Sequence, residues 1–514
     1  MNPITDKILS YKEAPAALGK LKAEGKKVVQ CHGTFDLLHP GHLYHLEEAR
    51  ELGDLLVVTI TGEKHVNKGP GRPYFGDELR CKSLTALEFV DYVVVIPYPV
   101  AIEAIECVKP DIYCKGHEYR DTSSDVTGNI HDDVSTVEKH GGRVEYVGSV
   151  VFSSTKFLNN HFDSHPPAVK QYLKELSQTT NPDNFRDTVE SFSKLKGLVI
   201  GDIIFDRYTT VLVQGLTSKN RILSARRLSE ETHAGGALAT FRHLRQFTSN
   251  VKLVSLAGTE SWASVELDNY LSETENQVLR LEDFTTIIKQ RFVEPVSEGH
   301  EMSKLFSVNF IDGAPPASYV EDTLIRHLEP LLSGVDFVLV MDFGHGVMGA
   351  RVRDFIQQKA PFLCLNCQTN SNNYGFNLIN RQYQRADSFS LDRAEMSLAT
   401  AMRDMDYSFE LNKLRKELKS SYAWLTLGEE ATIGLKQNET QVSSPSLESQ
   451  VLDTIGAGDA FCSVASLAAV SGIDLPLATF MGQLAGALAV KIPGNRECIQ
   501  KSRFLKAGMT LLNF

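Results

Sequence analysis

The chain has 514 residues, 42% of them hydrophobic and 23% charged, a composition typical of a folded globular protein that excludes a disordered or low-complexity scaffold. At roughly 150 residues per domain, this length indicates two or three domains. The 53 Lys and Arg residues against 64 Asp and Glu residues give a net charge of −11, so we expect neither a nucleic acid nor a membrane surface as a partner.

The N-terminus and the cysteines predict the compartment of the protein. The opening MNPITDKILSYKEA is polar where a signal peptide needs an apolar core, and no long uncharged apolar run occurs in the chain. The eight cysteines are scattered, which argues against a disulfide framework and suits a reducing cytoplasm. Cys364 and Cys367 form one CxxC pair, but no second pair lies nearby, so we predict no metal site there.

The first third of the chain alternates apolar segments typical of buried strands with segments of helical spacing. This alternation predicts a doubly wound, Rossmann-like parallel sheet in an α/β domain over residues 1–162. The expected strands are 28–31, 55–61, 93–96, 112–114 and 144–147, and the expected helices are 43–52, 77–89 and 101–108.

Residues 163–194 are polar and contain three prolines, which predicts a linker with one short helix at 169–176. A second α/β domain is expected over 195–514, because strand-like and helix-like segments alternate again. Its expected strands are 198–200, 251–256, 337–341 and 423–427, and 475–490 is expected to form a buried helix.

The first predicted strand leads into HGTFDLLHPGH (32–42), directly before a predicted helix. Such a turn binds anions, because free N–H groups and the positive end of the helix dipole point outward. His39 and His42 are three residues apart, so both imidazoles are expected on one side of the helix start. Gly33 and Gly41 allow a phosphate to approach the backbone. The segment therefore predicts a phosphate site.

This segment resembles the HxGH signature of the cytidylyltransferase-like nucleotidyltransferases. GRPYFGDELR (71–80) and KGHEY (115–119) resemble the adenylyltransferase half of the bifunctional heptose enzymes of lipopolysaccharide synthesis, and 148–155 resembles the family's Ser/Thr-rich closing motif. The resemblance covers about residues 25–160 and implies transfer of a nucleotidyl group from ATP or CTP. The nucleotide-binding residues it implies are Gly33, Thr34, Phe35, Gly41, Arg80, Ser153, Ser154 and Thr155.

In such a transfer, negative charge builds on the α-phosphate oxygens while pyrophosphate leaves, so hydrogen-bond donors and positive charge at that phosphorus suffice. His39, His42 and Lys68 are the expected catalytic side chains. The alternative for Lys68 is a solvated loop lysine, and Arg80 either holds phosphate or caps its helix. We expect Mg²⁺ to bridge the triphosphate.

The sequence DTIGAGDAF carries a second candidate site. Gly456, Ala457 and Gly458 have little or no side chain, so their N–H groups can form an anion cradle at the start of the apolar helix expected at 460–473. Asp459 stands at that helix start and can take a proton from a substrate hydroxyl. The pattern predicts an anion site beside a carboxylate that can act as a base.

DTIGAGDAF closely resembles the second signature of the ribokinase-like (PfkB) sugar kinases, and GDIIFDRY (201–208) is similar to the GDxxxDRY of the heptose kinases. The resemblance implies phosphorylation of a sugar by ATP, with Asp459 as the catalytic base. The sugar-binding residues it implies are Asp202, Asp206, Gly235 and Gly236, and the nucleotide-binding residues are Gly428, Gly456, Ala457, Gly458 and Asn495.

Two features depart from the kinase pattern. The strand end reads LNCQTN (365–370) where these kinases usually carry Asp-Pro-Lys, and an Asn-rich run (370–380) follows, which leaves the substrate open. No Asn-x-x-Glu metal motif occurs either. Asp392 or Glu395 is the expected replacement in organising Mg²⁺, and the alternative is that both are exposed helix carboxylates.

The two predicted domains match the parts of the bifunctional heptose enzymes in reversed order, with the transferase first. The leading hypothesis is a homo-oligomeric sugar kinase and sugar-phosphate nucleotidyltransferase that makes a nucleotide-activated sugar of the ADP-heptose type for a surface glycan. One alternative is a CTP-dependent cytidylyltransferase for a polyol or sugar-acid phosphate, because the N-terminal motif also resembles glycerol-phosphate cytidylyltransferase. Another alternative is a kinase-like domain that has lost catalysis and regulates its neighbour.

Overall fold

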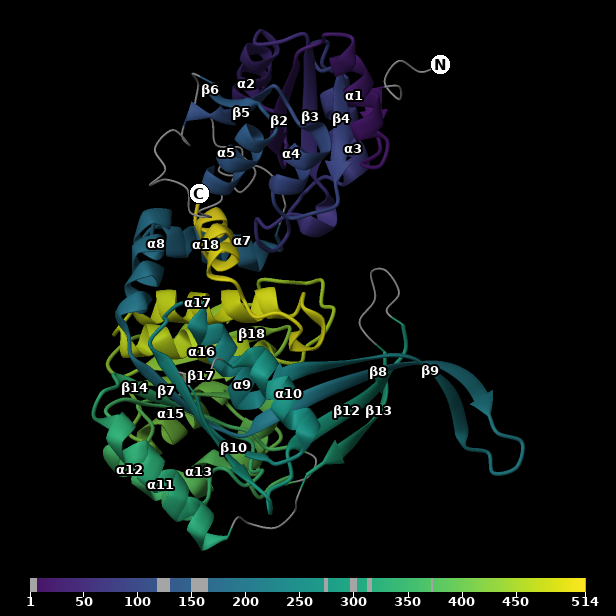
Figure 1. Cartoon of the computed structure of the whole chain (residues 1–514). Helices are drawn as coiled ribbons and strands as arrows, with labels where there is room; N and C mark the ends of the chain where they lie inside the picture. Colours follow the sequence, from purple (N-terminus) through teal and green to yellow (C-terminus); the bar gives the residue numbers. More distant parts are fainter. Residues whose placement is uncertain are drawn as a thin grey trace. The chain divides into compact units, whose positions relative to one another are not determined.

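The computed structural model describes residues 7–117, 130–148, 165–271, 276–295, 303–311, 317–370 and 373–513. These form two compact units, one of Met1–Pro182 with Leu505–Phe514 and the other of Asp183–Phe504 (Figure 1). The predicted domain limits at residues 162 and 195 stay a prediction. The predicted phosphate ligands Ser153, Ser154 and Thr155 lie outside the described residues.

The first unit contains a six-stranded, all-parallel sheet with the order β1-β4-β3-β2-β5-β6. Its central strands are apolar on both faces, as a parallel sheet covered by helices requires. The elements are β1 Ile8–Leu9, α1 Ala14–Ala23, β2 Val28–Gly33, α2 Pro40–Arg50, β3 Leu55–Thr61, α3 Asp77–Thr85, β4 Tyr92–Ile96, α4 Ile102–Val108, β5 Ile112–Gly116, α5 Ile130–Lys139, β6 Arg143–Val147 and α7 Pro167–Ser177.

Helices cover both faces of this sheet. Leu46 of α2 and Leu84 of α3 pack on one face, and Leu18 of α1 and Ala104 of α4 pack on the other. The strand order reverses at β2, because the chain continues to β3 on one side and returns to β5 on the other. Ligands of such sheets bind beyond the carboxyl end of the strand at this switch point. The turn after β2 lies there, which confirms the doubly wound α/β prediction.

The polar stretch predicted as a linker with one short helix is more ordered than expected. It contains α7 and a second helix, α8 Pro182–Ser191. Leu173 of α7 and Phe185 of α8 are fully buried, so each helix has an apolar face that packs against the protein. The helix predicted at 169–176 is α7, whereas the high polarity of α8 concealed its apolar face in the sequence.

The second unit is built on a nine-stranded sheet with the order β11-β10-β7-β14-β15-β16-β17-β18-β19, parallel except for its last two strands. The strands are β7 Gly197–Gly201, β10 Val251–Gly258, β11 Asn276–Leu281, β14 Phe337–Asp342, β15 Leu363–Cys367, β16 Ser388–Asp392, β17 Tyr422–Thr426, β18 Ala431–Lys436 and β19 Val442–Pro445. The helices are α9 Gly236–Arg245, α10 Ser261–Tyr270, α11 Ser318–Leu332, α12 Ala350–Lys359, α13 Ile379–Gln382, α14 Arg393–Thr400, α15 Tyr407–Glu417, α16 Ala457–Val470, α17 Leu475–Ala489 and α18 Lys501–Leu511, whose last residues belong to the first unit.

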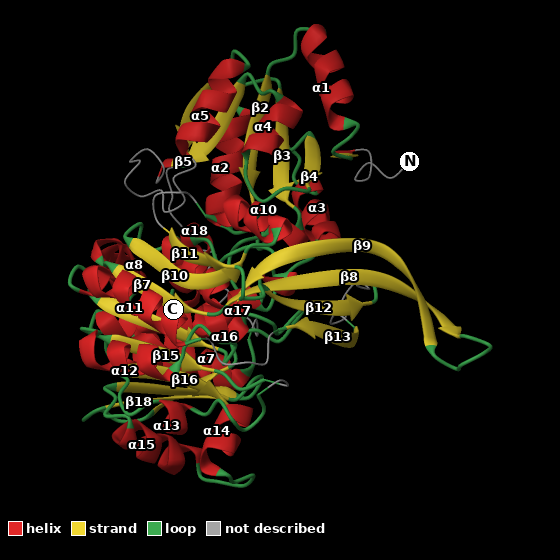
Figure 2. Cartoon of the chain, turned by 60° about the horizontal axis from the view of Figure 1, so that its bottom comes forward, coloured by secondary structure: helices red, strands yellow, loops and turns green. Residues whose placement is uncertain are grey.

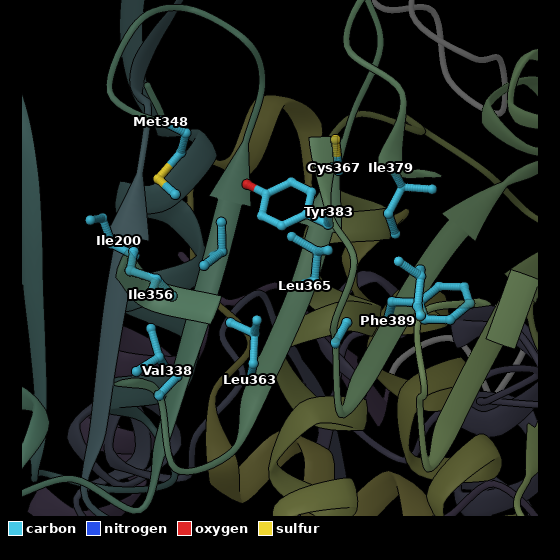
Figure 3. Packing of buried hydrophobic residues seen from close by; sticks show 14 of the residues in the cluster. Ile200, Val338, Met348, Ile356, Leu363, Leu365, Cys367, Ile379, Tyr383 and Phe389 are labelled. Atoms are coloured by element: carbon cyan, nitrogen blue, oxygen red, sulfur yellow. The ribbon is translucent and has the colours of Figure 1, made fainter. Parts of the chain in front are cut away.

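A large apolar core lies on one face of the nine-stranded sheet. Val338 of β14 and Leu363 and Leu365 of β15 pack there with Ile356 of α12 (Figure 3). The helix predicted at 460–473 is α16, which begins three residues earlier, at Ala457. Because β7 lies between β10 and β14, this sheet also has a switch point, at its third strand.

A separate four-stranded sheet, β13-β12-β8-β9, was not predicted. Its strands are β8 Ile203–Leu216, β9 Leu223–Gly235, β12 Ile287–Val293 and β13 Lys304–Phe310. Strands β8 and β9 form a long hairpin whose tip projects away from the rest of this unit (Figure 2). Through this sheet, Asp206 and Lys289 reach the second candidate site.

Among the described residues, no helix combines the length and apolarity needed to cross a bilayer. Helix α17 is the predicted buried apolar helix, and its side chains are almost all inaccessible.

Candidate active sites

The first site is the turn between β2 and α2, where the two predicted histidines come together. His39 is the N-cap residue of α2 and His42 lies in its first turn. Their rings stack with centroids 3.9 Å apart, and the Phe35 ring lies 5.2 Å from that of His42. Phe35 has a positive φ of 47°, and its ring covers Gly33, where an added Cβ would lie 3.1 Å from it. The turn thus has one fixed shape in which both imidazoles share one side.

Burial is the main determinant of the protonation state of these two histidines. It lowers the pKa of His42 to about 3, with the charges of His39 and Lys68 adding to the effect. Burial and the charge of Lys68 also lower the pKa of His39. Without a bound anion, both rings are therefore neutral near pH 7 and offer N–H groups as donors.

Lys68 lies close enough to both histidines to affect their protonation. Burial, together with positive neighbours such as Arg72, lowers the pKa of Lys68 to about 8. A solvated loop lysine would not show this depression. Lys68 is thus partly buried beside the two histidines, and a bound anion would favour its charged form.

Arg80, predicted either to hold phosphate or to cap its helix, instead supports the turn. Its guanidinium is fully buried and donates from Nη1 to the backbone oxygens of Thr34 at 2.7 Å and Thr61 at 2.9 Å. It also forms an ion pair with Asp77 in the first turn of its own helix. Its donors thus hold the ends of β2 and β3 together.

Asp36 has a structural role in this turn that the sequence interpretation left unassigned. Its Oδ1 accepts the backbone N–H groups of Tyr74 at 2.8 Å and Phe75 at 2.9 Å, and its Oδ2 faces Arg72 Nη1 at 3.3 Å. The carboxylate is almost fully buried. It therefore fixes the loop that follows Lys68 against the histidine turn.

The second site is a pocket at the carboxyl ends of the nine-stranded sheet, lined also by the four-stranded sheet. Its lining includes Asp206, Lys289, Gln368, Asp392 and Asp459. Gly456 and Asn495, both predicted to bind nucleotide, line it as well. The structure therefore brings Asp459, the predicted base, into one pocket with residues predicted to bind the sugar and the nucleotide.

Asp459 lies in the first turn of α16 and is 7% exposed. Burial and the negative charge of Asp206 raise its pKa to about 7, against the lowering effects of Gln368 and Lys289. Gln368 Nε2 donates to its Oδ1 at 3.1 Å. A carboxylate whose pKa lies near neutrality is suited to accept a proton from a hydroxyl.

The predicted anion cradle is a tight backbone turn. Gly456 is the N-cap residue of α16 with a φ of +82°, and its Cα faces Asn495, whose Oδ1 would lie 1.7 Å from an added Cβ. Ala457 donates its N–H to Thr454 O at 3.3 Å. The N–H groups of Gly458 and Asp459 have no acceptor within the helix, because they lie in its first turn. They can bind a phosphate oxygen.

We expect Gly456→Ala to weaken both folding and ATP binding. The left-handed φ costs an L-residue about 1–2 kcal/mol, and the new methyl group would displace Asn495. Movement of the turn would misplace the N–H donors of Gly458 and Asp459, which should weaken ATP binding by about tenfold or more. Thermal unfolding and ATP titration measure both effects. Gly458→Ala is the stability control, because no atom lies within 4 Å of its added Cβ; equal melting temperatures would contradict the role of strain.

Asp453, the first residue of the DTIGAGDAF segment, ties the cradle to the four-stranded sheet. Its Oδ1 pairs with Lys304 Nζ at 2.7 Å, and its Oδ2 accepts from Tyr208 OH at 3.2 Å and from the Gly494 N–H at 2.9 Å. The side chain is fully buried. Asp453 thus links β8, β13 and the turn of Asn495 to the start of the cradle.

Of the two carboxylates predicted to bind sugar, only Asp206 lines the pocket. Asp202 is fully buried, and its oxygens accept backbone N–H groups from Phe343, His345 and Val347 at 2.9, 3.2 and 3.1 Å. Burial and the nearby Asp342 raise the pKa of Asp202 to about 6. Asp202 therefore shapes the loop from 343 to 347, whose Phe343 lines the pocket.

At the glycine pair predicted to bind sugar, Gly235 and Gly236, oxygen atoms of the protein itself lie close to the backbone. An added Cβ on Gly235 would lie 2.4 Å from Asp206 Oδ2, and one on Gly236 would lie 2.4 Å from Asp202 O. Gly236 lines the pocket. Gly428 lies just beyond β17 with a φ of +65°, two residues after pocket-lining Thr426.

Asp392 and Glu395 line the pocket, but they bond to each other's backbone. Asp392 is the N-cap of α14 and Glu395 its third residue, and they form a reciprocal capping box at 2.8 Å each. Asp392 is exposed, whereas burial and Asp392 raise the pKa of Glu395 well above its usual range. The alternative of two exposed helix carboxylates is therefore wrong for Glu395.

Within the described ranges, no group of three or more His, Cys, Asp or Glu side chains is arranged to hold a metal ion. The CxxC cysteines, Cys364 and Cys367, are buried on strand β15, where burial raises the pKa of both thiols. They pack in the core.

Two protein-family models match this chain, one over the segment with His39 and His42 and one over the segment with Asp459. Residues 31–160 match the model of the cytidylyltransferase-like family, and residues 394–502 match that of the pfkB family of carbohydrate kinases. The predicted fold class and the predicted order of the two domains are thereby confirmed. The chain has a nucleotidyltransferase-like region followed by a carbohydrate-kinase-like region.

The N-terminal region is also similar to curated proteins. It is 43% identical over 136 residues to the bifunctional protein HldE of Pelobacter propionicus, a match that covers 26% of each chain. It is 39% identical over 153 residues to HldE of Magnetococcus marinus, covering 29% of this chain and 30% of that protein. The chain thus spans less than a third of the length of these relatives.

Solved structures with a similar fold include kinases. Phosphofructokinase-2 from Escherichia coli is 12% identical with a TM-score of 0.47, and the match covers 60% of this chain and 97% of that one. Ribokinase from Thermotoga maritima is 16% identical with a TM-score of 0.48, and the match covers 61% and 99%.

Proposed function

We propose that the chain is a bifunctional enzyme that phosphorylates a sugar with ATP and transfers a nucleotidyl group to a sugar phosphate. The observation that supports it best is that a helix N-terminus able to bind an anion occurs in both units, with different reactive side chains at each. Helix α2 follows the switch-point strand β2 of its parallel sheet, and α16 follows the loop after the edge strand β19. One helix start carries the stacked His39 and His42, and the other carries Asp459 beside the cradle.

In the kinase reaction, a sugar hydroxyl attacks the γ-phosphorus of ATP. A new O–P bond forms, the bond to the ADP oxygen breaks, and Asp459 takes the hydroxyl proton. The N–H groups at the start of α16 stabilise the charge that develops on the phosphate oxygens. Asp206 and the backbone at Gly236 line the sugar side of the pocket.

In the nucleotidyltransferase reaction, a phosphate oxygen of the sugar phosphate attacks the α-phosphorus of the nucleoside triphosphate, and pyrophosphate leaves. His39 and His42 donate N–H groups to the α-phosphate oxygens. Lys68 supplies positive charge once the triphosphate is bound. Arg80 and Asp36 hold the turn and the loop that present these groups.

Mg²⁺ is the expected cofactor of both reactions, because it neutralises and orients triphosphate oxygens. Such an ion needs only one or two protein carboxylates, since phosphates supply most of its ligands. The exposed Asp392 at the pocket wall fits this need better than the buried Glu395.

The name HldE and the resemblance to heptose enzymes favour a heptose-like sugar, a product of the ADP-heptose type and a use in surface glycan synthesis. The test supplies the full chain with Mg²⁺, ATP or CTP, and a panel of sugars, sugar phosphates and polyol phosphates, and measures ADP and pyrophosphate separately. We expect ADP with a heptose-like sugar and pyrophosphate with its phosphate and ATP. Pyrophosphate formed only from CTP and a polyol phosphate would contradict the proposed product.

The kinase reaction should depend on pH through Asp459. Its raised pKa, about 7, means that the carboxyl is largely protonated at pH 6 and ionised at pH 8. Only the ionised form can accept a proton, so kcat should rise with pH around 7 and fall about tenfold per pH unit well below it. A pH profile of ADP formation tests this. A profile that stays flat between pH 5 and 8 would contradict the role of Asp459.

A further inference from the structure

Gln368 follows strand β15 directly and is the residue in contact with the predicted base. Its Nε2 donates to Asp459 Oδ1 at 3.1 Å, and its side chain lines the pocket. Figure 3 shows Cys367 at the end of this strand with Ile379 and Tyr383 nearby. The charged and titratable groups near Asp459 on the surrounding elements are Asp206 on β8, Lys289 on β12, Glu395 on α14 and Cys462 on α16 itself.

The backbone of Gln368 is fixed on both sides. Its N–H donates to Asp342 O at 2.8 Å, and its oxygen accepts from Asn377 Nδ2 at 3.1 Å. The same Asn377 amide donates to Asp342 Oδ1 at 3.1 Å, and its oxygen accepts from Arg353 Nη2 at 3.2 Å. Asn377 is 4% exposed. Residue 368 therefore has little freedom to move away from Asp459.

This network gives the Asn-rich segment a role. Asn370 and Asn373 each donate a side-chain N–H to Phe343 O, at 2.8 and 2.7 Å. Together with Asn377 they join the segment to the loop that begins at Asp342. Amides suit this place because they donate to carbonyl and carboxylate oxygens without adding charge beside the buried Asp202 and Asp342. The segment thus supports the backbone from which Gln368 projects.

We infer that Gln368 is a positioning residue for Asp459, which it holds by Oδ1 so that Oδ2 faces the substrate hydroxyl. The inference rests on the proposed kinase function of this pocket. Because the amide hydrogen bond also stabilises the charged carboxylate, Gln368 tunes the pH at which the base becomes active. Because the Gln side chain carries no charge, it lowers the working pH of the base less than a cationic side chain at this place would.

Two substitutions at this position should shift the pH profile in opposite directions. Gln368→Leu removes the donor, so the midpoint of the kcat profile should rise by about one pH unit and the maximal kcat should fall about tenfold. Gln368→Lys places an ammonium beside the carboxylate, so the midpoint should fall by about one unit. KM for ATP should stay within about twofold in both, because the cradle is untouched. A purely structural role would not produce opposite shifts.

The control is Gln384→Leu, the same change at an exposed glutamine after the Asn-rich segment, which should keep the wild-type profile. If Gln368→Leu does not fold, Gln368→Asn replaces it, because the Asn side chain is too short to reach Asp459. The test then compares Gln368→Asn with Gln368→Lys. Wild-type midpoints in the folded variants would overturn the inference. Carboxyl titration of Asp459 by NMR, assigned with Asp459→Asn, separates the two proposals. Shifted titration without any kinase activity would overturn the proposed function and keep the positioning role, whereas activity with unshifted titration would overturn the positioning role.

Discussion

Replacing Asp459 by Asn should lower the turnover of the kinase reaction by about 10²–10⁴-fold, the usual contribution of a general base. Asn has the same shape and can still accept the Gln368 hydrogen bond, but it cannot take a proton. The cradle at Gly456 is unchanged, so ATP should bind with wild-type affinity. Steady-state ADP formation and calorimetric titration with ATP measure the two quantities.

The stability of this variant provides an internal control. The pKa of Asp459 is raised in the folded protein, so its ionised form destabilises the fold at pH values above its unfolded pKa. Asp459→Asn should therefore melt at or above the wild-type temperature at pH 8. Asp404→Asn, at an exposed position, removes the same charge and should keep wild-type turnover. Wild-type turnover in Asp459→Asn would remove this residue from its role.

The parallel sheets were predictable because their strands are apolar on both faces. β3 and β14 are mostly apolar, and their side chains are buried along almost the whole strand. β9 was not predictable in this way, because most of its side chains are exposed on both faces. Its sequence is also rich in charged and polar residues, among them Arg226, Arg227 and two glutamates. It is a strand through its pairing with β8, which no local pattern reveals.

The residues of the candidate sites likewise fall into two groups, those that local sequence reveals and those that only the packing of distant segments brings together. His39, His42, Gly456 and Asp459 occur in short segments at helix starts, so contiguous sequence was enough to find them. Lys289 and Gln368 stand alone in the chain and join the pocket only through the packing of separate strands. The signal available for Gln368 was its place after a buried parallel strand, where ligands of such sheets bind.

Two residues were found by motif but given roles that their surroundings do not favour. Arg80 and Asp202 are both fully buried, and both use their hydrogen-bonding groups on the backbone of neighbouring loops. A charged group that is buried needs such partners, because desolvation without them is costly. Sequence shows the residue type but not the burial, so it cannot distinguish a ligand contact from support of the loop beside it.

Replacing His42 by Ala should reduce pyrophosphate release from a sugar phosphate and nucleoside triphosphate by about 10²–10³-fold, the cost of losing one donor in comparable oxyanion sites. The neutral ring stabilises charge that develops only as pyrophosphate leaves, so nucleoside triphosphate binding should stay within about threefold of wild type. The kinase reaction uses the separate cradle at Gly456 and should be unaffected. Both activities are measured on one preparation, with His131→Ala at an exposed position of α5 as the matched control. Unchanged pyrophosphate release would contradict the histidine site, and loss of both activities would indicate misfolding or a shared site, because a donor at the α-phosphate has no part in transferring the γ-phosphate.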